Sequence, residues 1–184
     1  QLDLAAKGVL TNLSGFSDLG GGLYRFSGTA AAATTAIQAL TFDPAENRVA
    51  PGSTETTTFT ITVDDGIAAP TTDNATTVIS TSVNDAPTAG GSVAGQAVTD
   101  QTTVDPFSGV TIGDVDNPAQ TLTVDVQLDL AAKGVLTNLG GFSDLGGGLY
   151  RFSGTAAAAT TAIRGLTFDP TENRVSPGLT ETTT

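Results

Sequence analysis

The strongest constraint on the fold of this chain is an internal repeat. Residues 1–58 and 127–184 are near copies at a constant offset of 126 positions (127 − 1 = 126), and only six positions differ. The differing pairs are Ser14/Gly140, Gln38/Arg164, Ala39/Gly165, Ala45/Thr171, Ala50/Ser176 and Ser53/Leu179. Self-similarity at one period marks a repeat array, and a period of this length suits one whole domain per repeat.

A short polar stretch, residues 83–88, is the predicted joint between two such domains. In it Asn84 and Asp85 are poor strand residues, and Pro87 cannot donate to a β-ladder. We therefore predict that residues 1–85 are the C-terminal part of one repeat and residues 86–184 the N-terminal part of the next. On this interpretation each part lacks strands, which neighbouring repeats or other copies of the chain supply by strand pairing.

Short segments with alternating apolar and β-branched residues predict strands separated by Gly, Pro and Asp turns. These segments are residues 1–4, 8–13, 23–27, 40–42, 56–63, 76–83, 107–112 and 121–126. Residues 29–40 are Ala-rich instead, with Ile37 and Leu40 spaced for one helical face and with Ser27 or Thr29 placed to cap the start. We expect an all-β fold, an antiparallel β-sandwich with one short crossing helix per unit.

The composition excludes several classes of function. With 7 Lys and Arg against 19 Asp and Glu, the net charge is −12, which disfavours nucleic acid and anionic membranes as partners. No apolar run is long enough to span a bilayer, so membrane insertion is not expected in this window. His and Cys are absent, so the usual bases and nucleophiles are missing. Carboxylate pairs could serve a glycosidase, but here they recur in the turns of every unit, so we predict no enzyme.

Acidic residues and one Asn gather where the predicted strands end. They are Asp43, Glu46, Asp64, Asp65, Asn84, Asp85, Asp114, Asp116, Asp169 and Glu172. Ca²⁺ takes six to eight hard oxygen ligands from carboxylates, Asn amides and backbone carbonyls, so clustered short acids suit it. The alternative is that these Asp and Asn residues cap turns and keep the loops soluble. We favour metal for the set around residues 83–88 and leave both interpretations open for any single Asp.

At this point the sequence resembles a known family. The joint at residues 83–88, the strand and D-x-D at residues 107–116, the Ala-rich helix, and the stretch at residues 59–66 look like the cadherin-like (VCBS-type) tandem repeats of large bacterial surface and biofilm adhesins. The resemblance implies an Ig/cadherin-like antiparallel β-sandwich and calcium ions at each joint between repeats.

The resemblance also implies which residues hold calcium. Around the joint in this chain it points to Asp43 and Glu46, then Asn84 and Asp85, then Asp114 and Asp116. It assigns Asp64 and Asp65 to the preceding joint, and Asp169 and Glu172 to the following one. The linker is shorter than the D-x-N-D-N of cadherins, and the base loop reads D-P-A-E rather than D-R-E. These departures leave the number of ions open.

Two functions from different classes follow. The first is a structural, adhesive module of an extracellular or cell-surface bacterial fibre, with joints stiffened by calcium. The alternative is a binding module that recognises a surface glycan or a protein receptor through the loops around residues 14–22 and through Tyr24 with Arg25. Near-identity of the copies favours the first, because a spacer array tolerates identical units whereas a specialised binding domain usually occurs once. That argument is an analogy of architecture.

Overall fold

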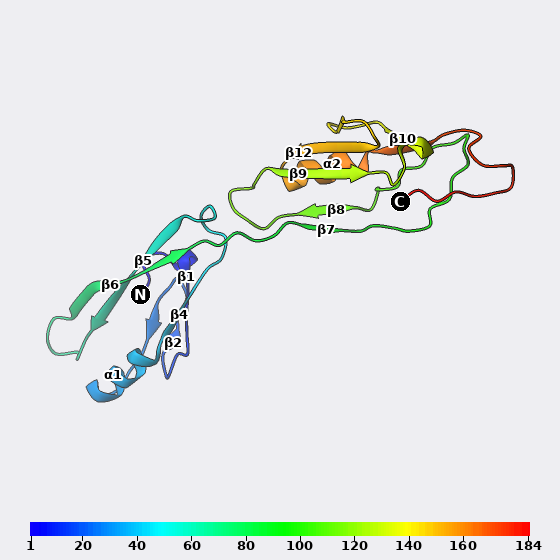
Figure 1. The fold of residues 1–184 in the computed structure, drawn as a ribbon. Coiled ribbons are helices and arrows are strands. Elements are labelled where there is room, and N and C mark those ends of the chain that lie inside the picture. The colour runs from blue at the N-terminus through cyan, green and yellow to red at the C-terminus, as the bar shows by residue number, and fades with distance from the viewer. The chain divides into compact units, whose positions relative to one another are not determined.

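The structure, a computed structural model that describes residues 1–184, divides into two compact units. Unit 1 comprises Gln1–Asn84 and unit 2 comprises Asp85–Thr184. The division falls one residue before the predicted boundary between residues 85 and 86. The backbone is 34% strand and 14% helix, with the strands in small antiparallel sheets, so the predicted β-rich class is confirmed (Figure 1).

Unit 1 is built from three pairs of antiparallel strands and one helix. Its elements are η1 (Ala5–Lys7), β1 (Gly8–Thr11), β2 (Ser17–Asp18), β3 (Tyr24–Arg25), α1 (Ala30–Ala39), β4 (Thr41–Pro44), β5 (Thr54–Val63) and β6 (Thr71–Thr81). Strand β1 pairs with β4, β2 with β3, and β5 with β6. The strands predicted at residues 56–63 and 76–83 are therefore found as β5 and β6, which pair with each other.

Unit 2 repeats the elements of unit 1 from η1 to β4 and adds strands before them, while β5 and β6 have no counterpart among its strands. Its elements are β7 (Thr88–Gly90), β8 (Thr111–Gly113), β9 (Leu122–Gln127), η2 (Ala131–Lys133), β10 (Gly134–Thr137), β11 (Ser143–Asp144), β12 (Leu149–Gly154), α2 (Ala156–Arg164) and β13 (Thr167–Pro170). Strand β7 pairs with β8, β10 pairs with β13, and β12 lies between β11 and β9 in a three-stranded sheet. Helix α2 lies against the sheet of β9 and β12 (Figure 1).

The predicted helix is confirmed in both copies. The side chain of Thr29 accepts a hydrogen bond from the N–H of Ala32 at 3.3 Å, which identifies Thr29 as the N-cap of α1. Gln38 is exposed, as expected for a position where the copies differ between Gln and Arg. Neither helix, nor any other in the structure, has the length and apolar character needed to cross a bilayer.

Several strands begin or end away from their predicted positions. The start of β6 is Thr71 rather than residue 76, and β8 covers Thr111–Gly113 rather than residues 107–112. Strand β7 forms in a Gly-rich segment for which no strand was predicted. In unit 1 the strand predicted at residues 1–4 is reduced to a single bridge between Leu2 and Phe59.

Most of the hydrophobic core belongs to unit 2. Its buried side chains are Val110, Leu128, Leu136, Phe142, Tyr150, Phe152, Ala159, Ala162, Ile163, Leu166 and Phe168. Residue Val110 comes from the segment before the second copy, and β9 and Ile112 pack against the same cluster. Leu2 and Ala36 are the buried hydrophobic residues of unit 1.

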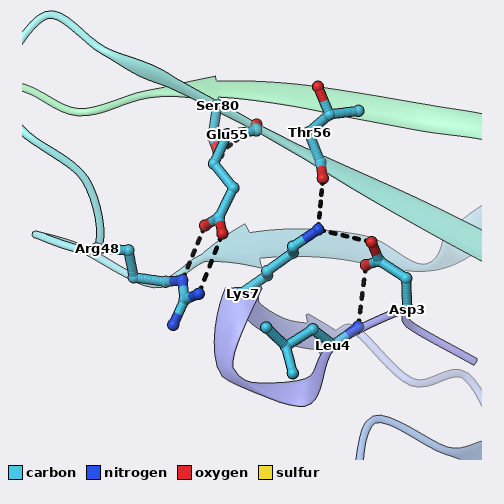
Figure 2. A network of polar contacts seen from close by, with 7 residues as sticks. All are labelled: Asp3, Leu4, Lys7, Arg48, Glu55, Thr56 and Ser80. Atoms are coloured by element: carbon cyan, nitrogen blue, oxygen red, sulfur yellow. Dashed lines mark hydrogen bonds and ion pairs between the residues drawn. The ribbon is translucent and has the colours of Figure 1, made fainter.

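A polar clamp ties the start of β5 to the N-terminal segment of unit 1 (Figure 2). The Lys7 ammonium donates to the Asp3 carboxylate at 2.6 Å and to the Thr56 carbonyl at 2.7 Å. Beside it the Arg48 guanidinium forks onto Glu55 with bonds of 2.8 and 3.0 Å. These charge-assisted bonds fix the position of the N-terminal segment against the start of β5.

The same clamp recurs in unit 2. Lys133 bonds to Asp129 and to the Thr182 carbonyl, and the Arg174–Glu181 ion pair corresponds to the Arg48–Glu55 ion pair of unit 1. The Asp129 N–H also donates to the Thr184 carbonyl at 2.8 Å, as the Asp3 N–H donates to the Thr58 carbonyl at 3.0 Å in unit 1. The polar contacts of this clamp are thus the same in the two copies.

Candidate metal centre

The D-x-D loop after β8 is the part of the chain where carboxylates are held most closely. Asp116 is buried at 5% exposure, and Asp114 is half-buried. The N–H of Asp116 donates to one carboxylate oxygen of Asp114 at 3.0 Å. One oxygen of Asp116 accepts from the N–H of Asp85 at 3.1 Å and from the side-chain amide of Gln120 at 2.9 Å. The loop therefore draws in Asp85, the first residue of unit 2.

The other oxygen of each carboxylate is buried without a hydrogen-bond partner. These atoms are Oδ2 of Asp114 and Oδ1 of Asp116. A buried carboxylate oxygen without a donor costs on the order of 1–3 kcal/mol or more in lost solvation. No Lys or Arg side chain forms an ion pair with either residue. A bound cation would supply the missing partner for both oxygens.

The donor set fits a hard cation. Two Asp carboxylates bring two negative charges, and oxygen is the donor type that Ca²⁺ takes. Within each unit, however, no three acidic side chains come together in an arrangement that could hold a metal ion. The remaining ligands of a calcium ion at this loop would have to be backbone carbonyls and water.

The remaining predicted ligands in unit 1 lie in separate places. Asp64 and Asp65 follow β5, both are exposed, and both cap a turn: Asp64 accepts from the N–H of Gly66 at 2.8 Å, and Asp65 accepts from Ile67 and Ala68 at 3.0 Å. The Ala68 and Ile67 bonds lower the pKa of Asp65 below its ordinary value. These contacts match the turn-capping alternative for this pair.

The acids that follow the helices are all exposed. Asp43 lies in β4 and Asp169 at the same position of β13, while Glu46 and Glu172 lie in the turns beyond these strands. Asn84 is the last residue of unit 1 and is exposed. In unit 2 the structure does not bring Asp169 and Glu172 together with Asp114 and Asp116 as a group that could hold a metal ion.

One member of the site was missed by the sequence reasoning. Gln120 lies four residues after Asp116 and orients its carboxylate through the 2.9 Å amide bond. A lone Gln in a polar loop gives no signal in sequence. The only clue was its position between the D-x-D and the next strand.

Tyr24, which was considered for sugar binding, and its counterpart Tyr150 each accept a backbone hydrogen bond within their own unit. The phenol oxygen of Tyr150 accepts from the N–H of Leu136 at 3.0 Å, and its ring is only 2% exposed. Tyr24 makes the same bond to the N–H of Leu10. In the loop before it, Asp18 caps the Gly20 turn at 2.8 Å. The contacts of these residues therefore supply no feature that favours a glycan site.

Searches against protein-family models, among curated proteins and among solved structures each found no match. The cadherin-like resemblance accordingly stays a prediction.

Proposed function

We propose that this chain is a structural module of a repetitive bacterial cell-surface or extracellular fibre protein. Each unit belongs to an Ig/cadherin-like β-sandwich repeat with one crossing helix, and calcium stiffens the joints between repeats. The β-rich units, the sequence repeat between them and the net charge of −12 support this function. The absence of His and Cys agrees with a role that needs no catalysis.

The observation that carries the proposal is the pair of buried, unpartnered oxygens on Asp114 and Asp116. Both lie in the loop that also accepts the N–H of Asp85, where the chain enters unit 2. A divalent cation at this loop would be bound next to the covalent connection between successive repeats. Its binding would restrict the backbone there and so stiffen the connection.

Calcium binding is tested by titrating the metal-free 184-residue chain calorimetrically and by following its thermal unfolding. We expect calcium to raise the melting temperature of unit 2, because a ligand that binds only the folded state stabilises it by mass action. At a concentration of about 100 times the dissociation constant the gain is about 2.7 kcal/mol. Magnesium at the same concentration should give less, because it dehydrates reluctantly and demands stricter geometry.

The single variants Asp114→Asn and Asp116→Asn should each abolish most of the calcium response. The matched control is Asp144→Asn, which removes the same charge from an exposed turn cap in unit 2. Equal loss of the response in all three variants would mean that only net charge matters. No calcium response in the parent chain would refute the calcium part of the proposal.

A further inference from the structure

The second copy contains a strand pairing that the first copy lacks. In unit 2, β12 pairs with β11 on one side and with β9 on the other, in the register Leu149↔Gln127 to Gly154↔Leu122. In unit 1, β3 pairs with β2 only. Residues 23–28 and Leu149–Gly154 have the same sequence, Leu-Tyr-Arg-Phe-Ser-Gly. The difference therefore comes from the neighbouring strand and not from the residues themselves.

The free edge of β3 has the side chains of an acceptor. Arg151 forks onto Asp125 of β9 with two bonds of 2.7 Å, whereas Arg25, its counterpart, makes no ion pair. Phe152 is 9% exposed beside β9, whereas Phe26 is half-exposed. A strand on this edge would bury the Phe26 ring and bring an acid to Arg25.

The first backbone hydrogen bond of the pairing that β3 lacks is already present in unit 1. The N–H of Leu2 donates to the Gly22 carbonyl at 2.9 Å, as that of Leu128 donates to Gly148 at 3.0 Å beside β9. On its other side this segment bonds to β5: the terminal amino group of Gln1 donates to the Thr60 carbonyl at 2.7 Å, and the Thr60 N–H donates to the Gln1 carbonyl at 2.8 Å. Gln1 therefore marks the place where a strand enters between β3 and β5.

We propose that the facing edges of β3 and β5 are an acceptor slot for one strand of the β9 type, Leu-Thr-Val-Asp-Val-Gln, from the protein's own repeats. The strand runs antiparallel to β3 in the register of unit 2. Its last residue, the Gln, is Gln1 itself, and its Asp lies opposite Arg25. The filled slot completes a five-stranded sheet in the order β2, β3, inserted strand, β5, β6. This inference rests on the repeat organisation of the proposed function and does not involve calcium.

The β9 sequence has the alternation that such a slot requires. Val124 and Val126 alternate with Thr123 and Asp125, so one face is apolar and the other presents the acid to Arg151. Backbone bonds provide the affinity in such β-augmentation, and alternate side chains provide the specificity. A strand without an acid opposite Arg25, or with Pro at the centre, fits the slot less well.

The test is the full chain extended before Gln1 by a copy of residues 104–126. Amide exchange is measured by NMR in EDTA, so a failure of calcium binding cannot affect the result. Residues 23–28 and Leu149–Gly154 have the same intrinsic rates because their sequence is the same. In the original chain the edge-facing amides of residues 23–28 should exchange at least about tenfold faster than those of Leu149–Gly154, and in the extended chain the ratio should fall to about one.

Two variants sharpen the result. Val124→Pro in the added copy should restore fast exchange at residues 23–28, because Pro breaks a central strand. Arg25→Ala should speed this exchange in the extended chain and leave it unchanged in the original chain. If the extension leaves residues 23–28 unprotected while Leu149–Gly154 stays protected, the slot is not an acceptor and the proposal is wrong. If the original chain already shows equal rates, the slot is filled by another segment and the proposed occupant is wrong.

Discussion

The two copies of one sequence reach different degrees of burial. Leu166 is 0% exposed in unit 2, whereas Leu40 at the same position of unit 1 is half-exposed. Ile163 is buried and Ile37 is not. The helices have the same N-cap and nearly the same residues, so local propensity does not account for the difference.

The neighbouring strands account for it. In unit 2 the segment before the copy supplies β8 and β9, and Thr160 of α2 exchanges two hydrogen bonds with the backbone of Ile112 at 2.8 and 3.0 Å. In unit 1 the hydroxyl of Thr34, the counterpart of Thr160, bonds back to Ala30 of its own helix at 2.9 Å. The comparison shows that this sequence forms its helix in both units, while the length of its third strand and the burial of its core depend on strands added from outside the copied segment.

The largest effect should come from truncating one leucine in each copy. Leu166→Ala removes a fully buried side chain from the core of unit 2 and should cost about 3 kcal/mol of unfolding free energy. Leu40→Ala removes a half-exposed side chain and should cost about 1 kcal/mol in unit 1. Urea unfolding followed by NMR signals resolved for each unit measures both. Equal costs would show that the two copies are packed alike and would break the comparison.

The sequence predicted the local elements well and the long-range pairing less well. The alternating segments and the capped Ala-rich helix carried their own signals. The start of β6 carried no such signal, because Asp73 and Asn74 are poor strand formers. Asp73 is drawn into the strand because it pairs with Ile61 of β5, and Asn74 lies at the irregularity in the register that comes next. Tertiary pairing overrode local preference there.

The candidate site was predicted in part for a similar reason. The D-x-D spacing identified Asp114 and Asp116, but spacing says nothing about burial. The unpartnered oxygens and the amide of Gln120 depend on how the loop folds back on itself. Asp64 and Asp65 carried the same kind of signal in sequence, yet the structure places them in an exposed turn. A short acidic motif therefore does not reveal which oxygens lack a donor.

The next effect concerns the tyrosine hydroxyl. Tyr150→Phe leaves the buried N–H of Leu136 without its acceptor and should cost unit 2 about 1–2 kcal/mol. Tyr24→Phe removes the same bond from the partly exposed N–H of Leu10, which water can reach, so the cost should be about 0.5 kcal/mol. The chain has two Tyr and no Trp, so in each variant the remaining tyrosine fluorescence reports the other unit as a control.

A smaller effect should follow from exchanging the residues that differ at the end of the helix. The Arg164 guanidinium donates to the Val110 carbonyl at 2.7 Å, whereas Gln38 is exposed. Arg164→Gln should therefore destabilise unit 2 by about 1 kcal/mol. Gln38→Arg should leave unit 1 unchanged, because no counterpart of Val110 lies beside α1. A gain of stability from Gln38→Arg would show that another carbonyl takes that place.

The smallest effect distinguishes the two arginines of the repeated strand. The Arg151 guanidinium, through its forked bonds, holds the pKa of Asp125 below its ordinary value, whereas Arg25 has no such acid. A lowered carboxyl pKa in the folded state stabilises the fold above the ordinary pKa, and this contribution is lost as the pH falls through the lowered pKa, below about pH 4. Because both partners are exposed, salt should weaken the effect. Carboxyl NMR titration should show the pKa of Asp125 rising towards its ordinary value in Arg151→Gln, while Arg25→Gln should leave every carboxyl unchanged. If the Asp125 pKa is the same in Arg151→Gln, the ion pair does not form in solution, and the charge preference proposed for the β3 edge loses its basis.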